Sequence, residues 1–309
     1  MISDFERMKV MENILIDAKE YVFIKDYKDN AVVRKSYNSL TEKTYGFDFE
    51  QWYQTGYWGN GYIPYSLMDG ECVVANVSAS IIDCLVLGEN RRYIQIGTIM
   101  TETTHRNQGL VRYLMEKVLD EWKNKFDMIY LYANDSVLNL YPKFGFMAVD
   151  EYQCSTTITN DHEIIVAEKL DMSLKDSREL VAKKINNSIS MSKLSIMKNV
   201  GLVMFYCTSF MRDNVYYLRG QDVIVIAEIE GDTLYLQDIF SQTEVDVNNI
   251  IKALTNKEIT TVVFGFTPND TSNYCMNLLK EDDTTLFVMK DNKNLFQNNK
   301  LMFPILSHA

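Results

Sequence analysis

The sequence predicts an α+β fold, a mixed α/β chain of two units in which helices flank a central mixed sheet. Two observations predict it: apolar residues change between helical and strand spacing along the chain, and 309 residues are long for a single hydrophobic core. A polar, charged stretch separates the two halves. We therefore expect a first domain at residues 1–159, a linker with one helix at 160–199 and a second domain at 200–309.

Strands and short helices open the first half. Asp69-Gly70 is a strong turn signal between two apolar runs, so it indicates a hairpin. The run that ends at Thr101 alternates as a central strand does, and its Gly97 marks a bulge or a close approach of another group. In order, the patterns predict a strand at 22–26, helices at 33–45 and 49–53, and strands at 62–68, 72–79 and 91–101.

A helix and a buried strand follow. An apolar i, i+4 stripe predicts a helix over residues 110–123. Residues 128–133 are apolar without alternation, which is typical of a strand that is covered on both faces and often parallel to its neighbour. Asn134-Asp135-Ser136 offers caps for a short helix that Gly145 ends, and a strand is expected at 146–158.

The second half repeats the order of strand, helix and strand. Its Glu230-Gly231-Asp232 is typical of a turn between two strands. The patterns predict strands at 202–207, 223–229, 233–240 and 261–266, and a helix at 247–254.

Composition argues against several classes of function. A net charge of −11 disfavours nucleic acid, whose phosphates attract basic patches. No run approaches the roughly 20 apolar residues of a membrane span, and residues 1–18 lack a signal-peptide core, so we expect a cytoplasmic protein that does not bind a membrane. The five cysteines form no CxxC pair. His105, His162 and His308 belong to no metal or triad motif, so no metal is predicted.

The loop at residues 103–111 joins a predicted strand to a predicted helix and carries one glycine, Gly109, at the helix start. The first N–H groups of a helix lack internal partners, its dipole is positive at that end, and glycine lets an anion approach the backbone closely. These properties indicate a site for a diphosphate. On the loop alone, however, an ordinary strand-to-helix turn is the better interpretation.

Two further segments occur at matching distances along the chain. Arg106, Gly109 and Val111 stand where the GNAT (Gcn5-related N-acetyltransferase) family has its cofactor loop of Gln or Arg, two residues, Gly, one residue, and Gly or Ala. Asn134 matches the asparagine after the family's next strand, and residues 141–146 match its Tyr-x-x-x-Gly-Phe segment. Residues 22–158 therefore resemble a GNAT domain, with Val111 departing from the pattern.

The resemblance implies acetyl-CoA as co-substrate. It implies that Tyr141 is the acid that protonates the thiolate. It also implies that the pantetheine arm is held by Asn134 and by the backbone of the strand end at residues 99–101. The oxyanion would be held by a backbone N–H near Met100 or Thr101, and a general base is not identified. The residues that the resemblance assigns to the cofactor are Ile99, Met100, Thr101, Arg106, Asn107, Gln108, Gly109, Leu110, Val111, Arg112 and Asn134.

The second half resembles a degenerate GNAT unit, since residues 241–243 offer no glycine and no room for a diphosphate. We expect this half to close one side of the acceptor cleft or to form a homo-oligomer interface, with Tyr216, Tyr217 and Tyr235 available for either. The leading hypothesis is an N-acetyltransferase that acts on a small or peptidic amine by direct attack. The alternative, which Val111 and the missing base favour, is a non-catalytic acyl-CoA-binding sensor or structural partner.

Overall fold

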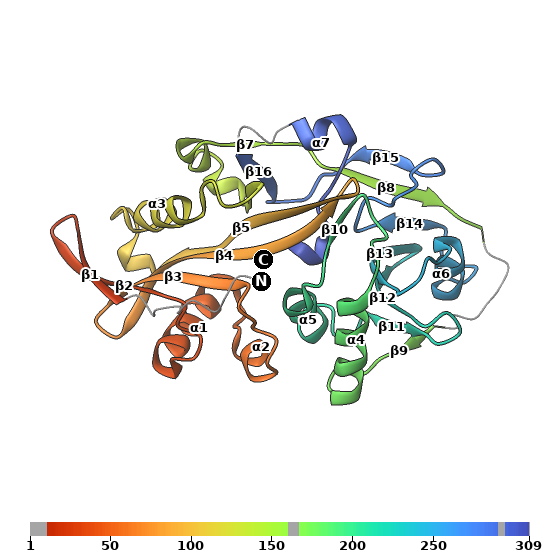
Figure 1. The fold of residues 1–309 in the computed structure, drawn as a ribbon, viewed down its shortest axis with the longest axis horizontal. Helices are drawn as coiled ribbons and strands as arrows, with labels where there is room; N and C mark the ends of the chain where they lie inside the picture. The colour runs from red at the N-terminus through yellow and green to blue at the C-terminus, as the bar shows by residue number, and fades with distance from the viewer. Residues whose placement is uncertain (1–10, 160–166, 290–293, 309) are drawn as a thin grey trace.

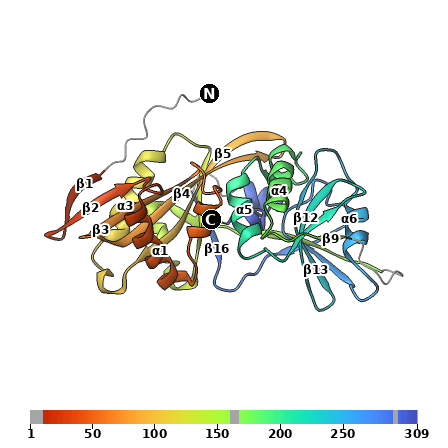
Figure 2. The same ribbon diagram turned by 90° about the horizontal axis from the view of Figure 1, so that it is seen from below.

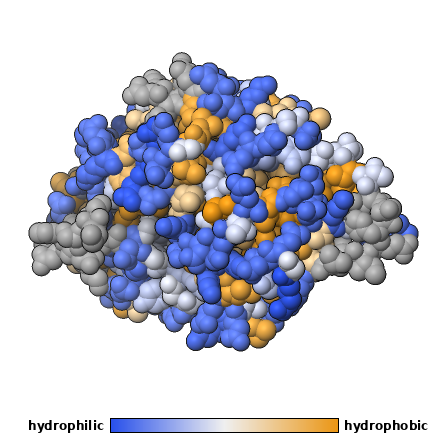
Figure 3. Space-filling model, turned by 45° about the vertical axis from the view of Figure 1, so that its right-hand side comes forward, coloured by the Kyte–Doolittle hydropathy of each residue, from blue (hydrophilic) through white to orange (hydrophobic). Residues whose placement is uncertain are grey.

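The computed structural model describes residues 11–159, 167–289 and 294–308. Two mixed sheets lie next to each other and helices cover both, which confirms the predicted fold class (Figure 1). Figure 3 shows hydrophilic side chains over much of one face, with hydrophobic side chains gathered between them. Within the described residues, no helix is both long and apolar enough to cross a membrane.

The first sheet has nine strands in the order β1-β2-β3-β4-β5-β6-β16-β7, with β10 beside β4. The predicted hairpin is confirmed, because β3 and β4 pair around Gly70, whose φ is +60°. The predicted parallel pairing of the buried strand is confirmed as well, for β6 runs parallel to β5. The strands are β1 (Met11–Ile16), β2 (Lys19–Lys25), β3 (Tyr62–Asp69), β4 (Cys72–Val86), β5 (Glu89–Thr101), β6 (Met128–Ala133), β7 (Phe146–Ala148), β10 (Leu194–Ile196) and β16 (Thr285–Met289).

Helices cover both faces of this sheet. On one face, α3 (Leu110–Trp122) packs its apolar stripe against alternate residues of β3, β4 and β5. On the other face lie α1 (Ala31–Tyr45) and α2 (Glu50–Gln54), whose aromatic side chains form a separate cluster (Figure 1). Asn30 caps α1 through its side chain, and Gly46 ends that helix with a φ of +79°. These helices match the ones predicted from apolar spacing.

The second sheet has seven strands in the order β15-β8-β14-β13-β12-β11-β9. The predicted strand, helix and strand repeat is confirmed: β13 and β14 are parallel, and α6 (Val247–Leu254) joins them and packs on one face. The other face is covered by α4 (Lys175–Asn187) and α5 (Val200–Thr208). The strands are β8 (Tyr152–Thr157), β9 (Glu168–Lys169), β11 (Val215–Leu218), β12 (Val223–Glu230), β13 (Thr233–Phe240), β14 (Thr261–Phe264) and β15 (Cys275–Leu278).

The two sheets exchange strands. β8, from the first half of the chain, pairs with β14 and β15 in the second sheet. β16, from the second half, lies between β6 and β7 in the first sheet, and α7 (Asn294–Asn299) follows it. The strand predicted at 146–158 is therefore two strands, β7 and β8, in different sheets. Whether the segments 1–159 and 200–309 fold as separate domains stays a prediction, and residues 160–166 of the expected linker lie outside the described residues.

The strand predicted at 202–207 is wrong, because this segment is the helix α5. An unbroken apolar run does not distinguish a buried strand from a helix buried on all sides. α5 is of the second kind, since its side chains enter three different clusters: Leu202 beside the first sheet, Phe205 beside α1 and α2, and Met204 beside the second sheet. Figure 2 shows α4 and α5 between the two lobes of the molecule.

The contact between α5 and α2 is close. Trp52 donates its Nε1 hydrogen to the carbonyl of Gly201 at 2.8 Å. A Cβ on Gly201 would lie 2.8 Å from the backbone oxygen of Tyr57, which is nearer than side chains pack. Only glycine therefore lets α5 sit this close to the segment after α2.

Replacing Gly201 with alanine should push α5 away from α2 and lower the free energy of unfolding by about 1–3 kcal/mol, the usual effect of overpacking. Gly220→Ala is the matched control, because its Cβ would meet nothing within 4 Å and its φ is not in the left-handed region. Denaturant unfolding of both variants measures the difference. Equal stability for the two would show that α5 does not need this close approach.

Candidate active site

The ends of β5 and β6 part from each other. The two strands pair in parallel from Tyr93 opposite Met128 to Ile96 opposite Leu131, and the pairing stops there. Beyond that point β5 still pairs with β4 on its outer edge, and β6 still pairs with β16. The inner edges of both strand ends therefore face a gap in the middle of the sheet.

A bulge in β5 lies where the strands part. Ser78 of β4 lies opposite Gly97, but Asn76 lies opposite Met100, so β5 has an extra residue over this stretch. Thr98 takes a φ of +47°, which is rare for a β-branched residue. The bulge predicted near Gly97 is confirmed, and it bends β5 away from β6.

Buried polar side chains hold the bulge in place. Asn76, which is fully buried, donates from Nδ2 to the carbonyl of Thr98 at 2.8 Å. The hydroxyl of Tyr62 lies 2.6 Å from Oγ1 of Thr98, and Ser66 donates to Oδ1 of Asn76 at 2.8 Å. Sequence reasoning did not single out these residues. Their signal was the presence of the polar residues Ser66 and Asn76 within strands that are mostly apolar.

A cavity of about 1410 Å³ opens at the gap. Its walls come from the end of β5, the loop before α3, the end of β6, the segment after α1, and α5. All the residues that the sequence assigned to the cofactor line this one cavity, and so does Tyr141. The structure thus brings together residues that lie between positions 99 and 141 of the chain.

One end of the cavity is the start of α3. Asn107 and Gly109 have φ values of +61° and +76°, and the helix begins directly after them at Leu110. The N–H groups of its first turn have no partner inside the helix. The side chain of Val111 is half-buried and packs against the core of the first sheet, so its departure from the family pattern leaves the backbone N–H unchanged. This end can bind an anion.

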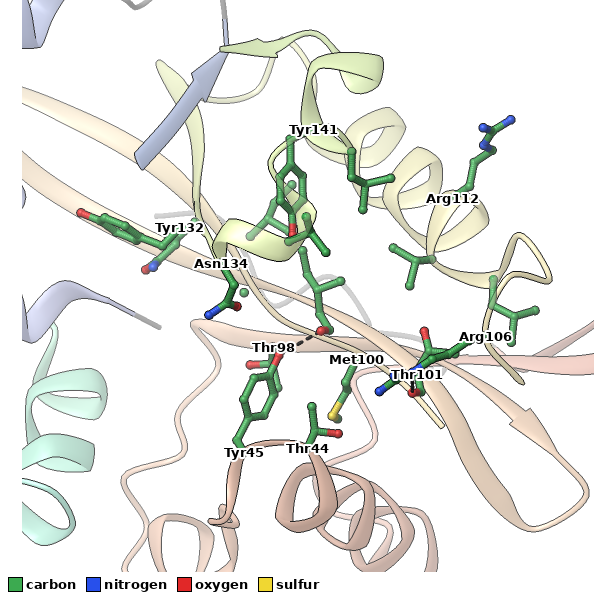
Figure 4. A pocket seen from close by; sticks show the side chains of 18 of the residues that line it. Thr44, Tyr45, Thr98, Met100, Thr101, Arg106, Arg112, Tyr132, Asn134 and Tyr141 are labelled. Carbon is green, nitrogen blue, oxygen red and sulfur yellow. Dashed lines mark hydrogen bonds between the residues drawn. The ribbon is translucent and has the colours of Figure 1, made fainter. Parts of the chain in front are cut away.

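Arg106 and Arg112 lie near the start of α3, whereas the side chain of Gln108 is engaged in other hydrogen bonds. Figure 4 shows Arg106 next to Thr101 and Arg112 further along α3. Gln108 is held by other contacts: its Oε1 accepts from the Tyr21 hydroxyl at 2.8 Å, and its Nε2 donates to the carbonyl of Thr104 at 3.1 Å. The part of Gln108 left for a ligand is its backbone.

Two tyrosines approach the parted strands from opposite sides (Figure 4). The hydroxyl of Tyr45 donates to the carbonyl of Ile99 at 2.9 Å. Tyr141 is 3% exposed, packs its ring against Phe287, and points its hydroxyl into the cavity. Burial raises the pKa of Tyr141 to about 12, so its phenol stays protonated at neutral pH.

Asn134 lines the cavity at the end of β6, where the sequence predicted it. Its Nδ2 donates to Oδ2 of Asp283 at 2.9 Å, and Asp283 also accepts from the N–H of Asp135 at 2.7 Å. Asp283 precedes β16, so the inserted strand fixes this asparagine. The sequence could not show this contact, because the two residues are 149 positions apart.

Among the residues that the structure describes, no carboxylate is placed as an evident general base. Glu102 pairs with Lys43 at 2.8 Å, which lowers the pKa of Glu102, and the cavity lining given by the described residues does not include it. His105 is engaged with Asp69 at 3.0 Å, and His162 lies outside the described residues. Within those residues there is also no group of three or more His, Cys, Asp or Glu side chains that could hold a metal ion.

His308 lines the cavity, although no sequence motif contains it. Its ring lies against that of Tyr132 with centroids 3.9 Å apart. Its Nε2 is buried, and among the described residues it has no hydrogen-bond partner. Burial lowers the pKa of His308 to about 3, so the imidazole is neutral at physiological pH.

The second half of the chain completes one wall of the cavity. Leu202, Phe205, Tyr206 and Phe210, from α5 and the turn after it, all line it. The aromatic residues that the sequence had proposed for this role do not: Tyr216, Tyr217 and Tyr235 lie in β11 and β13 and are not among the described lining residues.

A family model described as the acetyltransferase (GNAT) domain matches residues 30–149. This segment contains the parted strands, the loop before α3 and Tyr141. Residues 30–149 of this chain are a GNAT acetyltransferase domain. For this segment, the match confirms the resemblance to the GNAT family and the acyltransferase class that it implies. No curated protein sequence matches the chain significantly.

Three solved structures share the fold of this chain over nearly its whole length. A probable N-acyltransferase of Enterococcus faecalis V583 has a TM-score of 0.54 at 12% identity, covering 94% of this chain and 74% of its own. A GCN5-related N-acetyltransferase of Kribbella flavida has a TM-score of 0.53 at 13% identity, and the match covers 91% of this chain and 70% of that protein's chain. Eis1 of Mycobacterium abscessus has a TM-score of 0.51 at 11% identity, and the match covers 90% of this chain and 73% of that protein's chain. At these identities the likeness shows the fold.

Replacing Gly109 with aspartate should weaken the binding of acetyl-CoA by about 10-fold or more, because a like charge beside a diphosphate costs at least about 1.4 kcal/mol. Gly231→Asp is the control. Its φ is also positive, at +59°, and a Cβ there would meet nothing within 4 Å, but it lies in a turn of the second sheet. Isothermal titration calorimetry gives both affinities. Unchanged affinity in Gly109→Asp would remove the start of α3 from the binding site.

Proposed function

We propose that this protein transfers an acetyl group from acetyl-CoA to a primary amine by direct attack. One observation supports this most strongly: a helix N-terminus and a protonated phenol lie at two places along one gap between parted strands. The gap exposes the backbone edge of a strand. Pantetheine is an extended arm that contains amide groups, so it can form hydrogen bonds with such an edge. The start of α3 offers the anion site that the diphosphate of the coenzyme needs.

Each segment then has a role. The backbone of residues 106–112 binds the diphosphate, and Arg106 and Arg112 add positive charge beside it. The inner edge of Ile99, Met100 and Thr101 pairs with the pantetheine amides, and Asn134 bounds the arm from β6. This arrangement directs the thioester toward Tyr141.

The reaction balances without a covalent enzyme intermediate. The amine nitrogen forms a bond to the thioester carbonyl carbon, and the oxyanion accepts a hydrogen bond from a backbone N–H near Met100 or Thr101. The carbon–sulfur bond then breaks, and the thiolate takes the proton of the Tyr141 phenol. The proton that the amine loses returns to the phenolate through water.

A second candidate function is a non-catalytic acyl-CoA-binding sensor or structural partner. The lack of an evident carboxylate base in the described lining favours it. Release of the free thiol of coenzyme A on incubation with amines separates the two functions. Tight binding of acetyl-CoA without thiol release would support the sensor. A cytoplasmic location and a homo-oligomeric state remain proposals from the sequence.

Replacing Tyr141 with phenylalanine should lower kcat by about 10²–10⁴-fold, the usual effect of losing a positioned proton donor. Acetyl-CoA affinity should stay within about threefold, since the ring and its packing on Phe287 remain. The measurement is thiol release under saturating acetyl-CoA. Tyr113→Phe, on α3 at the other end of the cavity, is the control and should keep its rate.

The pH dependence of the wild-type rate gives a second readout of the role of Tyr141. A donor must hold its proton, and burial raises the pKa of Tyr141 to about 12. The wild-type rate should therefore show no decline from loss of this proton between about pH 7 and pH 10. An unchanged kcat in Tyr141→Phe would remove Tyr141 from the mechanism.

A further inference from the structure

The cavity has a second end, beyond Tyr45, whose wall is aromatic. Neighbouring rings touch in sequence: Tyr45 and Phe47 have centroids 6.0 Å apart, Phe47 and Phe210 are 5.2 Å apart, and Phe210 and Phe205 are 5.7 Å apart. Tyr206 adjoins Phe210 at 6.2 Å. We call these five residues the aromatic wall. It joins the end of α1 and the segment after that helix to α5 and the turn after α5.

The aromatic wall begins at the reaction site. Tyr45 binds the carbonyl of Ile99, in the strand segment that faces the thioester under the proposed function. From there the wall leads away from the anion site. Phe210 is 56% exposed and Tyr45 is 41% exposed, so these rings present apolar surface to the cavity instead of filling a core. Aromatic surface of this kind at a cavity is typical of a ligand subsite.

The charges of the cavity lie at its other end. Among the described lining residues, the carboxylates are Asp17 and Glu116. Asp17 is in the turn after β1, next to Ile16, which approaches Gly109, and Glu116 is on α3. Neither belongs to the segments that carry the aromatic wall. Near the wall, Nε2 of His308 has no hydrogen-bond partner among the described residues, and the backbone oxygen of His308 accepts a hydrogen bond from the Tyr206 hydroxyl. The carboxylate of Glu281 acts electrostatically on Tyr206, but Glu281 is not among the described lining residues.

We infer that the acceptor is a primary amine with an apolar, aromatic or bulky aliphatic body, which packs on the aromatic wall and reaches His308 with a polar group. This inference rests on the proposed function and names its substrate class. Apolar walls with one or two placed polar groups are the usual composition of small-molecule sites. A polyamine or another polycation fits poorly, because its additional charges would be buried without a partner.

The apolar surroundings of the aromatic wall also help to explain how the amine loses its proton without an evident carboxylate base. Only the neutral form of an amine has the lone pair that attacks a thioester. Burial against apolar surface disfavours the ammonium form, so an amine bound there loses its proton more readily than in water. The aromatic wall thus supplies part of what a carboxylate base would supply.

The test uses the full chain saturated with coenzyme A, with 2-phenylethylamine and 1,4-diaminobutane as the two probes. Calorimetry measures the binding of each, and thiol release from acetyl-CoA measures turnover. We expect 2-phenylethylamine to bind and to have a kcat/KM at least about 10-fold above that of the diamine, which matches the contribution of a hydrophobic pocket.

Two variants locate the effect. Phe210→Ser should weaken 2-phenylethylamine binding by about 10-fold and leave coenzyme A affinity unchanged. Leu174→Ser is the matched control, because Leu174 is also 56% exposed but lies at the start of α4, outside the described cavity lining. Loss of affinity only in Phe210→Ser supports the inference.

The outcomes separate the two proposals. Binding of 2-phenylethylamine that depends on Phe210, without thiol release, supports the subsite and contradicts the proposed function. Turnover that favours 1,4-diaminobutane contradicts the inference and supports the function. Absence of 2-phenylethylamine binding, or equal binding in Phe210→Ser, overturns the inference.

Discussion

The bulge at Thr98 is the constraint on which the site depends. A regular β5 would continue to pair with β6 to the end of both strands and leave no gap. Thr98 instead takes a positive φ, and the amide of Asn76 and the hydroxyl of Tyr62 satisfy its polar atoms within the interior. A strained backbone of this kind persists only when its surroundings fix it. The gap, the cavity and the position of Ile99 follow from it.

The second constraint is α5, which joins the two lobes. Its side chains enter clusters on both sheets, and its Gly201 allows the close contact with α2. Because of this contact, Phe205 and Phe210 line the same cavity as the residues proposed to bind the coenzyme. The two lobes therefore contribute different parts of one cavity. The GNAT domain contributes the start of α3 and Tyr141, and α5 with the turn after it contributes three of the five residues of the aromatic wall.

Local patterns allowed much of the fold to be predicted, because periodicity and turn chemistry act over a few residues. α3, β6 and the hairpin at Gly70 agree with their patterns closely. The loop before α3 and Tyr141 were found for the same reason, since each has a short motif. The prediction failed for α5, because its apolar run has no period. The exchange of β8 and β16 was not predicted, because it depends on pairing between distant segments.

The site residues that sequence reasoning missed have long-range causes. Asn76 matters because of its contact with Thr98, 22 positions away, and His308 because the end of the described chain returns to Tyr132. The aromatic wall is made by two segments more than 150 positions apart, from Tyr45 and Phe47 to Phe205 and Phe210. Neither segment alone indicates a binding surface, because aromatic residues with such spacing are usually core.

The central claim is that the bulge creates the coenzyme site, and Asn76→Leu tests it most directly. Asn38→Leu is the control, because Asn38 is a similarly buried asparagine that bonds Glu50 on the helical face. Each variant should lose about 1–3 kcal/mol of stability through unsatisfied partners. Calorimetry should find acetyl-CoA affinity reduced by about 10-fold or more in Asn76→Leu and unchanged in Asn38→Leu. Equal affinity in both folded variants would contradict the account.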